Sequence, residues 1–470
     1  MYPNTEPGID EIAIYVQKAR NAQKKIADYS QNQVDELVTA VCWAIVRQDR
    51  AEQLAKLAVD ECGFGNYSDK VSKIRNRCMG TLRDMQGVKT VGIVEEIPEK
   101  GLIKIAKPVG VIAALIPTTG PDATPPLKTL LALKGRNAII VAAHPRTQKT
   151  TELTVKLMRE ACIQVGAPAD LVQVIENPSL SKTQKLMQQA DLIIATGGAG
   201  MVKAAYSSGT PAYGVGVGNA VHVVDETGDL DDAANTVVIA KKFDYATSCL
   251  ADNALVVHES VYDDLIKRLQ KLSAYMCSHE EKAKLQKLMW PDPENHIPSI
   301  DVIAKPAAHI AKLAGITVPD DCSCLIVEEN GTGPDYPFSG EKLSPVLALY
   351  RYSGVIDNAI DQVNAITGYQ GQGHTCGIHT TNDGHALSLA MQTKTARVMV
   401  NQSLNEGAGS PRNGMPYTLS LSCGTWGGNV TTENVNAKHM INLTWVSRPI
   451  KPRVLDENML FESHWQKYSR

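Results

Sequence analysis

The clearest chemical group in the sequence is the thiol of Cys249, in the run Thr247–Ser248–Cys249 of the stretch FDYATSCLADN (243–253). A thiolate attacks carbonyl carbons readily and can form a covalent intermediate. No second cysteine stands nearby at a spacing typical of a zinc site or a disulfide. Because most cysteines pack as small hydrophobic residues, Cys249 on its own is either a buried core residue or a nucleophile presented at the end of a loop.

Two further polar residues have types that suit catalysis or binding. Glu341 comes just before an apolar run in SGEKLSPVLALYRY. Its carboxylate can accept hydrogen bonds from ribose hydroxyls, or it can be an ordinary solvated loop residue. His374, in GQGHTCGIHT, is either a general base or a structural histidine with satisfied hydrogen bonds.

Two glycine-rich stretches can bring the backbone close to a ligand. In ATGGAG, Gly197 and Gly198 follow an apolar run and precede a helical pattern, and the bare N–H groups of a helix start suit a phosphate. The stretch is not G-x-G-x-x-G, so a plain strand–helix turn fits equally well. In AYGVGVGN, Gly214, Gly216 and Gly218 allow close contact with a ligand or another loop, or form a twisted strand edge.

These groups must be positioned by the surrounding elements, which alternate between strand and helix patterns. Short apolar runs in VGVIAALIP, AIIVAAHP, LVQVIEN and DLIIATGG are separated by helical segments. Such alternation predicts a doubly wound parallel sheet, in which ligands bind beyond the carboxyl ends of the strands. The loops IPTTGPDATP, AAHPRT and ATGGAG should therefore border a site. A second α/β region, about 233–424, contains the cysteine loop and the runs PVLALYRY and ARVMVN.

The remaining segments frame this α/β class of fold. Residues 9 to about 90 have helical periodicity, with Ser30 as a predicted cap, and 93–108 resemble an exposed β-hairpin arm. These patterns divide the chain into a first region over 1–232, a second α/β region over 233–424 and a polar tail over 425–470.

Composition excludes several classes of function. A net charge of −3 gives no basic excess for nucleic acid or an anionic membrane surface, so neither partner is expected. The ten cysteines include no Cys-x-x-Cys pair, which favours reduced thiols in the cytoplasm and no bound metal. The first twenty residues contain no apolar run, so neither a secretory signal nor a membrane span is expected there.

Taken together and in this order, the motifs resemble the aldehyde dehydrogenase superfamily, and within it the acylating, coenzyme A-dependent branch. The resemblance covers essentially the whole chain. The stretches that carry it are PVGVIAALIPTTGP, LLALKGRNAIIVAAHPR, ATGGAGMVKAAYSSG, AYGVGVGN, EKLSPVLALYR, GHTCGIHT and CGTWGGNVTTENV. Within the branch, the sequence is most similar to the acylating sulfoacetaldehyde dehydrogenases, with the acylating succinate-semialdehyde dehydrogenases close. The resemblance implies two doubly wound α/β domains, a cofactor-binding domain over 1–232 and a catalytic domain over 233–424. It also implies a β-hairpin oligomerisation arm, a return segment with an oligomerisation tail over 425–470, and a homodimer or homotetramer.

The resemblance also implies roles for individual residues. Cys249 would attack the aldehyde to give a thiohemiacetal, and hydride would pass to a nicotinamide. The oxyanion would be held by the N–H of Cys249 and a donor from the PTTGP loop, where Thr119 stands, and His374 completes the predicted catalytic set. The residues implied for the dinucleotide are Pro117, Thr118, His144, Pro145, Arg146, Thr196, Gly197, Gly198, Gly216 and Glu341. Arg146 can accept a 2′-phosphate, which favours NADP, although NAD stays possible because NAD-using relatives have a similar His-Pro-Arg.

One absence predicts the fate of the acyl-enzyme. Hydrolytic members of the superfamily carry a glutamate in an E-L-G-G motif that activates water, whereas the corresponding stretch here is GVGVGN (214–219). Without that base, the thioester should persist until coenzyme A attacks it. The predicted reaction is aldehyde, coenzyme A and NAD(P)+ to acyl-CoA and NAD(P)H. The alternatives are a hydrolytic enzyme with another base, and a catalytically silent scaffold.

Departures from the branch pattern predict the substrate. Gly120 replaces an asparagine common in related enzymes, which should open room near the aldehyde, and Thr247 and Ser248 make the cysteine's surroundings polar. Arg412, in a loop that the resemblance places near the substrate mouth, suits a sulfonate or carboxylate, although a surface arginine is an equal alternative. We therefore expect an anionic tail: sulfoacetaldehyde first, succinate semialdehyde second, and acetaldehyde or propionaldehyde last.

Overall fold

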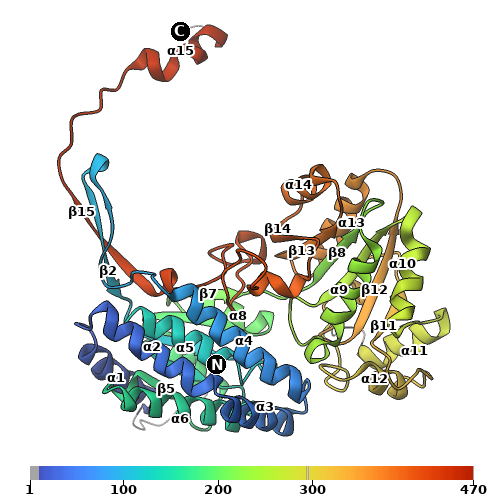
Figure 1. Ribbon diagram of the computed structural model, residues 1–470, viewed down its shortest axis with the longest axis horizontal. Coiled ribbons are helices and arrows are strands. Elements are labelled where there is room, and N and C mark those ends of the chain that lie inside the picture. Colours follow the sequence, from blue (N-terminus) through green and yellow to red (C-terminus); the bar gives the residue numbers. More distant parts are fainter. Residues whose placement is uncertain (1–9, 293, 295, 469–470) are drawn as a thin grey trace, which may run out of the picture.

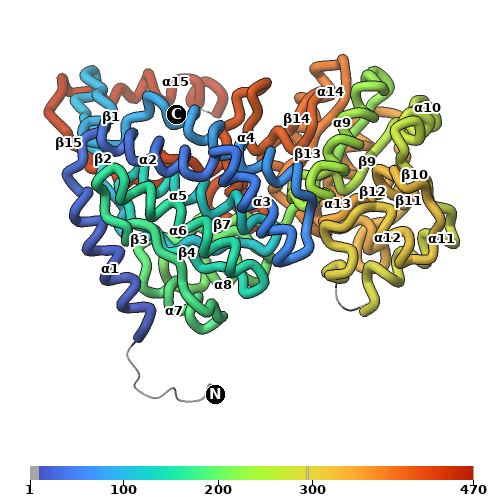
Figure 2. The backbone as a smooth tube through the Cα atoms, turned by 60° about the horizontal axis from the view of Figure 1, so that its bottom comes forward, coloured from blue at the N-terminus to red at the C-terminus, as the bar shows by residue number. Residues whose placement is uncertain are grey.

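The chain forms two α/β lobes that lie side by side, and a thin arm leaves the first lobe (Figures 1 and 2). The computed structural model describes residues 10–292, 294 and 296–468. No helix in this part of the chain is long and apolar enough to cross a lipid bilayer.

Four helices open the first lobe: α1 (Glu11–Lys25), α2 (Gln31–Val46), α3 (Gln48–Cys62) and α4 (Tyr67–Met85). Ser30 caps α2 as predicted. Its hydroxyl oxygen accepts a hydrogen bond from the N–H of Gln33, and the Gln33 side chain accepts one from the N–H of Ser30. This capping box satisfies two N–H groups at the start of the helix.

The sheet of the first lobe is parallel throughout and has the strand order β5-β4-β3-β6-β7. Its strands are β3 (Val111–Leu115), β4 (Ala138–Ala142), β5 (Val172–Val174), β6 (Leu192–Thr196) and β7 (Ala212–Val215). The accompanying helices are α5 (Thr124–Lys134), α6 (Gln148–Gln164), α7 (Leu180–Gln189) and α8 (Ala199–Tyr206). Every residue of β3 and β4 is buried, which is why these strands are unbroken apolar runs in the sequence.

The second lobe contains a larger parallel sheet with the order β10-β11-β12-β9-β8-β13-β14. Its strands are β8 (Ala220–Val224), β9 (Asp252–His258), β10 (Ala274–Met276), β11 (Cys324–Glu328), β12 (Val346–Tyr352), β13 (Gly373–His379) and β14 (Thr395–Val400). Its helices are α9 (Leu230–Lys242), α10 (Glu259–Lys271), α11 (His279–Met289), α12 (Ala307–Leu313), α13 (Ile356–Tyr369) and α14 (Asp383–Gln392). The two predicted doubly wound α/β domains are thus present.

The boundary between them differs from the one predicted at residue 232. Strand β8 pairs with β9 and β13 in the second sheet, so the chain crosses between the lobes after β7 and before residue 220. The sequence places β8 directly after the glycine-rich stretch, and its apolar pattern is equally compatible with either sheet. The pairing of β8 with β9 and β13, which are distant in sequence, decides that β8 belongs to the second sheet.

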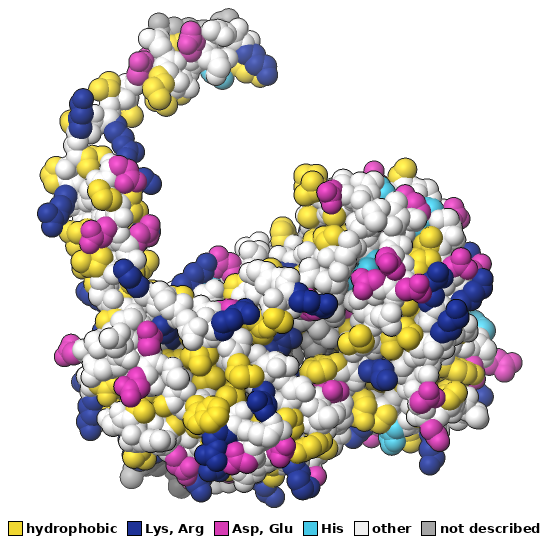
Figure 3. Space-filling model, viewed as in Figure 1, with side chains coloured by type: hydrophobic (Ala, Val, Ile, Leu, Met, Phe, Trp, Pro, Cys, Tyr) yellow, Lys and Arg dark blue, Asp and Glu magenta, His cyan; other side chains and the backbone are white. Residues whose placement is uncertain are grey.

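The arm is a three-stranded sheet of order β1-β2-β15. The predicted hairpin is formed by β1 (Gly92–Ile97) and β2 (Leu102–Pro108), and β15 (Ile441–Ser447) adds antiparallel to β2. After β15 the chain runs away from the lobes to the helix α15 (Glu457–Tyr468) (Figure 1). Apolar side chains lie along this arm (Figure 3). They include Leu443, Trp445, Val454, Leu455 and Met459, all of which are exposed.

Candidate active site

A cavity of about 630 Å³ lies where the two lobes meet. Its first wall comes from the carboxyl ends of β3, β4, β6 and β7, as the rule for parallel sheets predicts. Its second wall comes from residues just before β8, β9 and β12, at the amino edge of the other sheet. The loops of both sheets therefore converge on one space.

A buried lysine holds two of these strand ends in place. Lys128, on α5, donates hydrogen bonds to the carbonyl oxygens of Leu115 (2.6 Å) and Ile194 (2.9 Å). Burial lowers its pKa well below the ordinary range. The loop after β3 and the turn after β6, which both border the cavity, therefore have a common anchor.

Most of the residues predicted from the sequence line this cavity. They are Pro117, Thr118, Thr119, Gly120, His144, Pro145, Thr196, Gly197, Gly198, Gly216, Thr247, Ser248, Cys249 and Glu341. These residues come from both lobes, so the fold brings together the implied cofactor loops and the candidate nucleophile.

Cys249 is half-buried and packs against Val215, Leu250, Ala408 and Leu421. Burial raises the pKa of its thiol to about 12, the charge of Glu341 adds to the rise, and Arg397 opposes it. At neutral pH these surroundings favour the neutral thiol over the thiolate. A neutral resting thiol resists oxidation but must lose its proton before it attacks.

Glu341 is the only acid among the described residues that line the cavity. Its Oε1 accepts a hydrogen bond from the N–H of Gly218 at 3.1 Å, and its own N–H donates to Gln370 Oε1 at 3.0 Å. Burial raises the pKa of its carboxyl to about 8, against the smaller effects of the Gly218 bond and Lys342. At neutral pH the side chain is therefore mainly protonated.

The cofactor wall fits a dinucleotide. The hydroxyl of Thr196 is buried and has no hydrogen-bond partner among the described residues, so it is available to a ligand. A Cβ atom on Gly198 would meet nothing within 4 Å, and one on Gly197 would meet only Met201. Open backbone at the start of α8, beside an unused hydroxyl, is what a phosphate or ribose group requires.

Two predicted substrate residues have different surroundings from those expected. Gly120 does not open free space, because a Cβ atom there would lie 2.6 Å from the hydroxyl of Thr124, which itself lines the cavity. The Thr247 hydroxyl donates to Asp244 Oδ2 at 2.9 Å, so its proton is not offered to a substrate. The Ser248 hydroxyl oxygen accepts from the N–H of Leu250, which leaves its proton available.

Three predicted residues do not line the cavity. His374 is fully buried in β13, neither ring nitrogen has a partner among the described residues, and burial together with Arg397 lowers its pKa to about 3. Arg146 is exposed beside His144. The side chain of Arg412 is 75% exposed and pairs with Glu406, which explains why it does not reach the cavity. A general base at His374 and tail binding at Arg412 therefore lack the expected geometry.

The structure adds two cations that the sequence reasoning missed. Lys73 and Arg77 lie one turn apart on α4 and both line the cavity. Lys73 pairs with Asp244 at 2.7 Å. Among the described residues, Arg77 donates to three backbone carbonyl oxygens, those of Asn405 (3.0 Å), Ala408 (3.0 Å) and Gly409 (2.7 Å). The sequence signal for these two residues was a stripe along one face of α4 in which lysine and arginine stand where apolar residues are usual.

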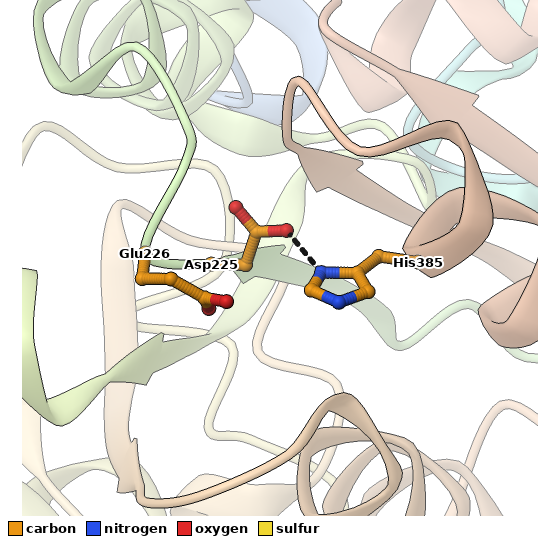
Figure 4. Close-up of side chains that lie close together, drawn as sticks. All are labelled: Asp225, Glu226 and His385. Atoms are coloured by element: carbon orange, nitrogen blue, oxygen red, sulfur yellow. Dashed lines mark hydrogen bonds and ion pairs between the residues drawn. The ribbon is translucent and has the colours of Figure 1, made fainter.

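A cluster of possible metal ligands lies elsewhere, beyond the carboxyl end of β8 (Figure 4). Asp225 Oδ2 accepts from His385 Nδ1 at 2.7 Å, and Glu226 stands beside them. Thr227 donates to Asp225 Oδ1 twice, from its N–H and its hydroxyl. Because the Asp225 carboxylate is already occupied by donors, we assign this cluster no part in the chemistry at Cys249.

The fold and the cavity define a two-domain enzyme in which Cys249 shares a cavity with strand-end loops that fit a dinucleotide. Comparison with known proteins agrees: a model of the aldehyde dehydrogenase family matches residues 6–284. A sulfoacetaldehyde dehydrogenase of Acholeplasma sp is 45% identical over 95% of this chain and 93% of its own. An acylating sulfoacetaldehyde dehydrogenase of Bilophila wadsworthia is 42% identical, covering 96% and 98%. The crystal structure of an acetylating aldehyde dehydrogenase from Geobacillus thermoglucosidasius superimposes with a TM-score of 0.91 at 35% identity, covering 96% and 100%.

The chain therefore belongs to the aldehyde dehydrogenase family, and within it to the acylating branch. The predicted fold class and the predicted resemblance are both confirmed.

Proposed function

We propose that this acylating aldehyde dehydrogenase converts sulfoacetaldehyde, coenzyme A and NADP+ to sulfoacetyl-CoA and NADPH, in a reversible reaction. The observation that carries the choice of substrate is Arg77. Arg77 lines the cavity of Cys249, and its guanidinium donates to three backbone carbonyl oxygens. No carboxylate among the described residues forms an ion pair with it, although the charge of Glu406 opposes the lowering of its pKa by burial. A half-buried cation at the wall of the cavity would bind a sulfonate or carboxylate tail through charge-assisted hydrogen bonds. The 45% and 42% identical relatives bear the name of the same aldehyde.

The chemistry at the nucleophile follows from its surroundings. The Cys249 thiol releases its proton to solvent, and its sulfur bonds to the aldehyde carbon, which gives the oxyanion of a thiohemiacetal. The N–H of Cys249 and the hydroxyl of Thr119 stabilise the oxyanion. A bound NADP+ supplies the hydride acceptor that oxidises this carbon. Thr196, Gly197, Gly198 and Glu341 would hold that dinucleotide against the first lobe.

The thioester then awaits a second nucleophile. The stretch 214–219, which borders the cavity where a water-activating glutamate stands in hydrolytic enzymes, contains no acid. Coenzyme A thiolate attacks the thioester carbonyl and releases Cys249 as its thiolate. Glu341 is the one described acid that could activate water instead, so it is the residue on which the hydrolytic alternative depends.

The tests of this function are assays of NADPH formation with purified protein and coenzyme A. Sulfoacetaldehyde, succinate semialdehyde and acetaldehyde are compared, with NAD+ in parallel to NADP+. We expect the highest kcat/KM with sulfoacetaldehyde. A preference for succinate semialdehyde would overturn the choice of tail, and a preference for acetaldehyde would overturn anion recognition altogether. A preference for NAD+ would overturn the choice of NADP+ and leave the rest of the proposal unchanged.

We also propose that the enzyme is a cytoplasmic homodimer or homotetramer built through the arm. All ten cysteines are unpaired, as a reducing compartment requires. The exposed Trp445, Val454 and Leu455 give the arm an apolar surface that a second copy would cover. Sedimentation of the full chain should give two or four copies, and a monomer would contradict the proposal.

A further inference from the structure

The turn just before the nucleophile has an unusual backbone. Asp244, Tyr245 and Ala246 have φ values of 49°, 50° and 57°, in the left-handed region that side chains other than glycine rarely adopt. Three such residues in succession form only where surrounding contacts impose the conformation. The turn leads directly into Thr247, Ser248 and Cys249.

The side chain of Asp244 supplies those contacts. It is fully buried, and its two oxygens accept hydrogen bonds from Lys73 Nζ (2.7 Å), Lys70 Nζ (3.4 Å), the Thr247 hydroxyl (2.9 Å) and the N–H of Asn66 (3.0 Å). Its own N–H donates to Asp69 Oδ2 at 2.7 Å. Burial alone would raise the pKa of Asp244, but Lys73 and Lys70 lower it.

The partners of Asp244 belong to two different walls of the cavity. Lys73 lies on α4 and Thr247 lies in the cysteine loop, and both line the cavity while they bond to the same carboxylate oxygen. The hydrogen bonds of Asp244 therefore link α4 to the cysteine loop, and we call this link the tie. Gly65 makes the tie possible, because any Cβ atom there would collide with the Asp244 carboxylate.

From this arrangement we infer that Asp244 is a positioning residue for Cys249. It does not line the cavity or touch the reacting atoms, and it acts by fixing the left-handed turn and the spacing between α4 and the nucleophile. A displacement of the sulfur by about 1 Å costs an enzyme on the order of 100-fold in rate. The inference concerns the acylation step and holds whichever aldehyde is the substrate.

The test is Asp244→Asn, because asparagine preserves the size of the side chain but removes the negative charge beside the two lysines. Its NH2 group also cannot accept from the N–H of Asn66 while its oxygen accepts from the lysines and Thr247. We expect kcat for both sulfoacetaldehyde and acetaldehyde to fall on the order of 100-fold, with the Kd for NADP+ within about twofold of the parent. The rate at which iodoacetamide alkylates Cys249, followed by mass spectrometry of the peptide that contains it, should also differ between the variant and the parent. This readout needs no substrate, so it separates a failure of this inference from a failure of the proposed substrate.

The matched control is Asp191→Asn. Asp191 likewise accepts from a cation, Arg20 (2.7 Å), and from a backbone N–H, that of Val111 (2.7 Å). It lies just before β6, at the amino ends of the strands, whereas the cavity lies at their carboxyl ends. It should lower Tm while kcat and the alkylation rate stay within about threefold. A kcat for Asp244→Asn within about threefold of the parent, or an equal loss in both variants, would overturn the inference.

If Asp244→Asn does not fold, a milder pair tests the same tie. Thr247→Val removes one bond to Asp244 and should lower kcat by about tenfold, while Thr247→Ser keeps the hydroxyl and should restore the rate. Equal rates for the valine and serine variants would refute the positioning role.

Discussion

Gly218 lies directly against Cys249. A Cβ atom on Gly218 would lie 2.5 Å from the Cβ of Cys249 and nearer still to its carbonyl oxygen. The N–H of the same glycine donates to Glu341. One residue without a side chain thus separates the nucleophile from the only described acid of the cavity, and sets how close they come.

Gly218→Ala should therefore disable the site. The methyl group forces the cysteine loop or the 214–219 stretch to move, so we expect a loss of about 1–3 kcal/mol in the free energy of unfolding and on the order of 100-fold in kcat. Gly368→Ala is the control, because a Cβ atom there meets nothing within 4 Å and the residue lies on α13. Alanine in a helix should leave kcat unchanged and raise stability by about 0.5–1 kcal/mol. Full activity of Gly218→Ala would show that the contact is unimportant.

Replacement of the nucleophile should abolish turnover without disturbing the cofactor wall. Cys249→Ala should lower kcat on the order of 10⁴-fold or more, because no other described thiol lines the cavity. The Kd for NADP+, measured by fluorescence or calorimetry, should be little changed. Retained turnover would mean that Cys249 is not the nucleophile, and lost NADP+ binding would mean that the variant is misfolded.

Arg77 and Arg412 can be compared directly as binders of the anionic tail. Arg77→Gln removes the charge and leaves two N–H donors for the three carbonyl oxygens. It should lower kcat/KM for sulfoacetaldehyde by about 10–100-fold, as expected for a charged hydrogen bond worth about 1.5–3 kcal/mol, and leave acetaldehyde almost unaffected. Arg412→Ala should change neither, because that side chain is exposed and paired with Glu406. An equal loss with both aldehydes in Arg77→Gln would exclude tail recognition.

Glu341 should make stability depend on pH in a defined direction. Its pKa is raised from 4.5 to about 8 by burial, so the folded state binds this proton more tightly than the unfolded state does. Stability from this group is then greatest below pH 4.5 and falls as pH rises to about 8, because the ionised carboxylate is left buried. Glu341→Gln cannot ionise, so its Tm relative to the parent should rise from pH 5 to pH 9. A constant difference would contradict the raised pKa.

Features that depend on short stretches of sequence could be predicted, whereas features that depend on contacts between distant segments could not. The turn at Gly197 and the thiol of Cys249, to which we assign the cofactor and the nucleophile, stand in short motifs whose order along the chain is characteristic. The ends of the strands of a parallel sheet also meet at one edge. Arg77 was missed because α4 reaches the cavity only through packing between distant segments. Arg412 was assigned to the substrate because its charge was visible, whereas its partner Glu406 and its exposure were not. The lobe boundary was misplaced because strand pairing decides which sheet takes β8.

The central claim is that the acyl-enzyme on Cys249 waits for coenzyme A, and a rapid-mixing experiment without coenzyme A tests it most directly. With sulfoacetaldehyde and NADP+, we predict a burst of about one equivalent of NADPH per enzyme chain, then no further turnover until coenzyme A is added. Steady turnover without coenzyme A would contradict the claim. If Glu341→Gln then abolished that turnover, Glu341 would be the base that activates water.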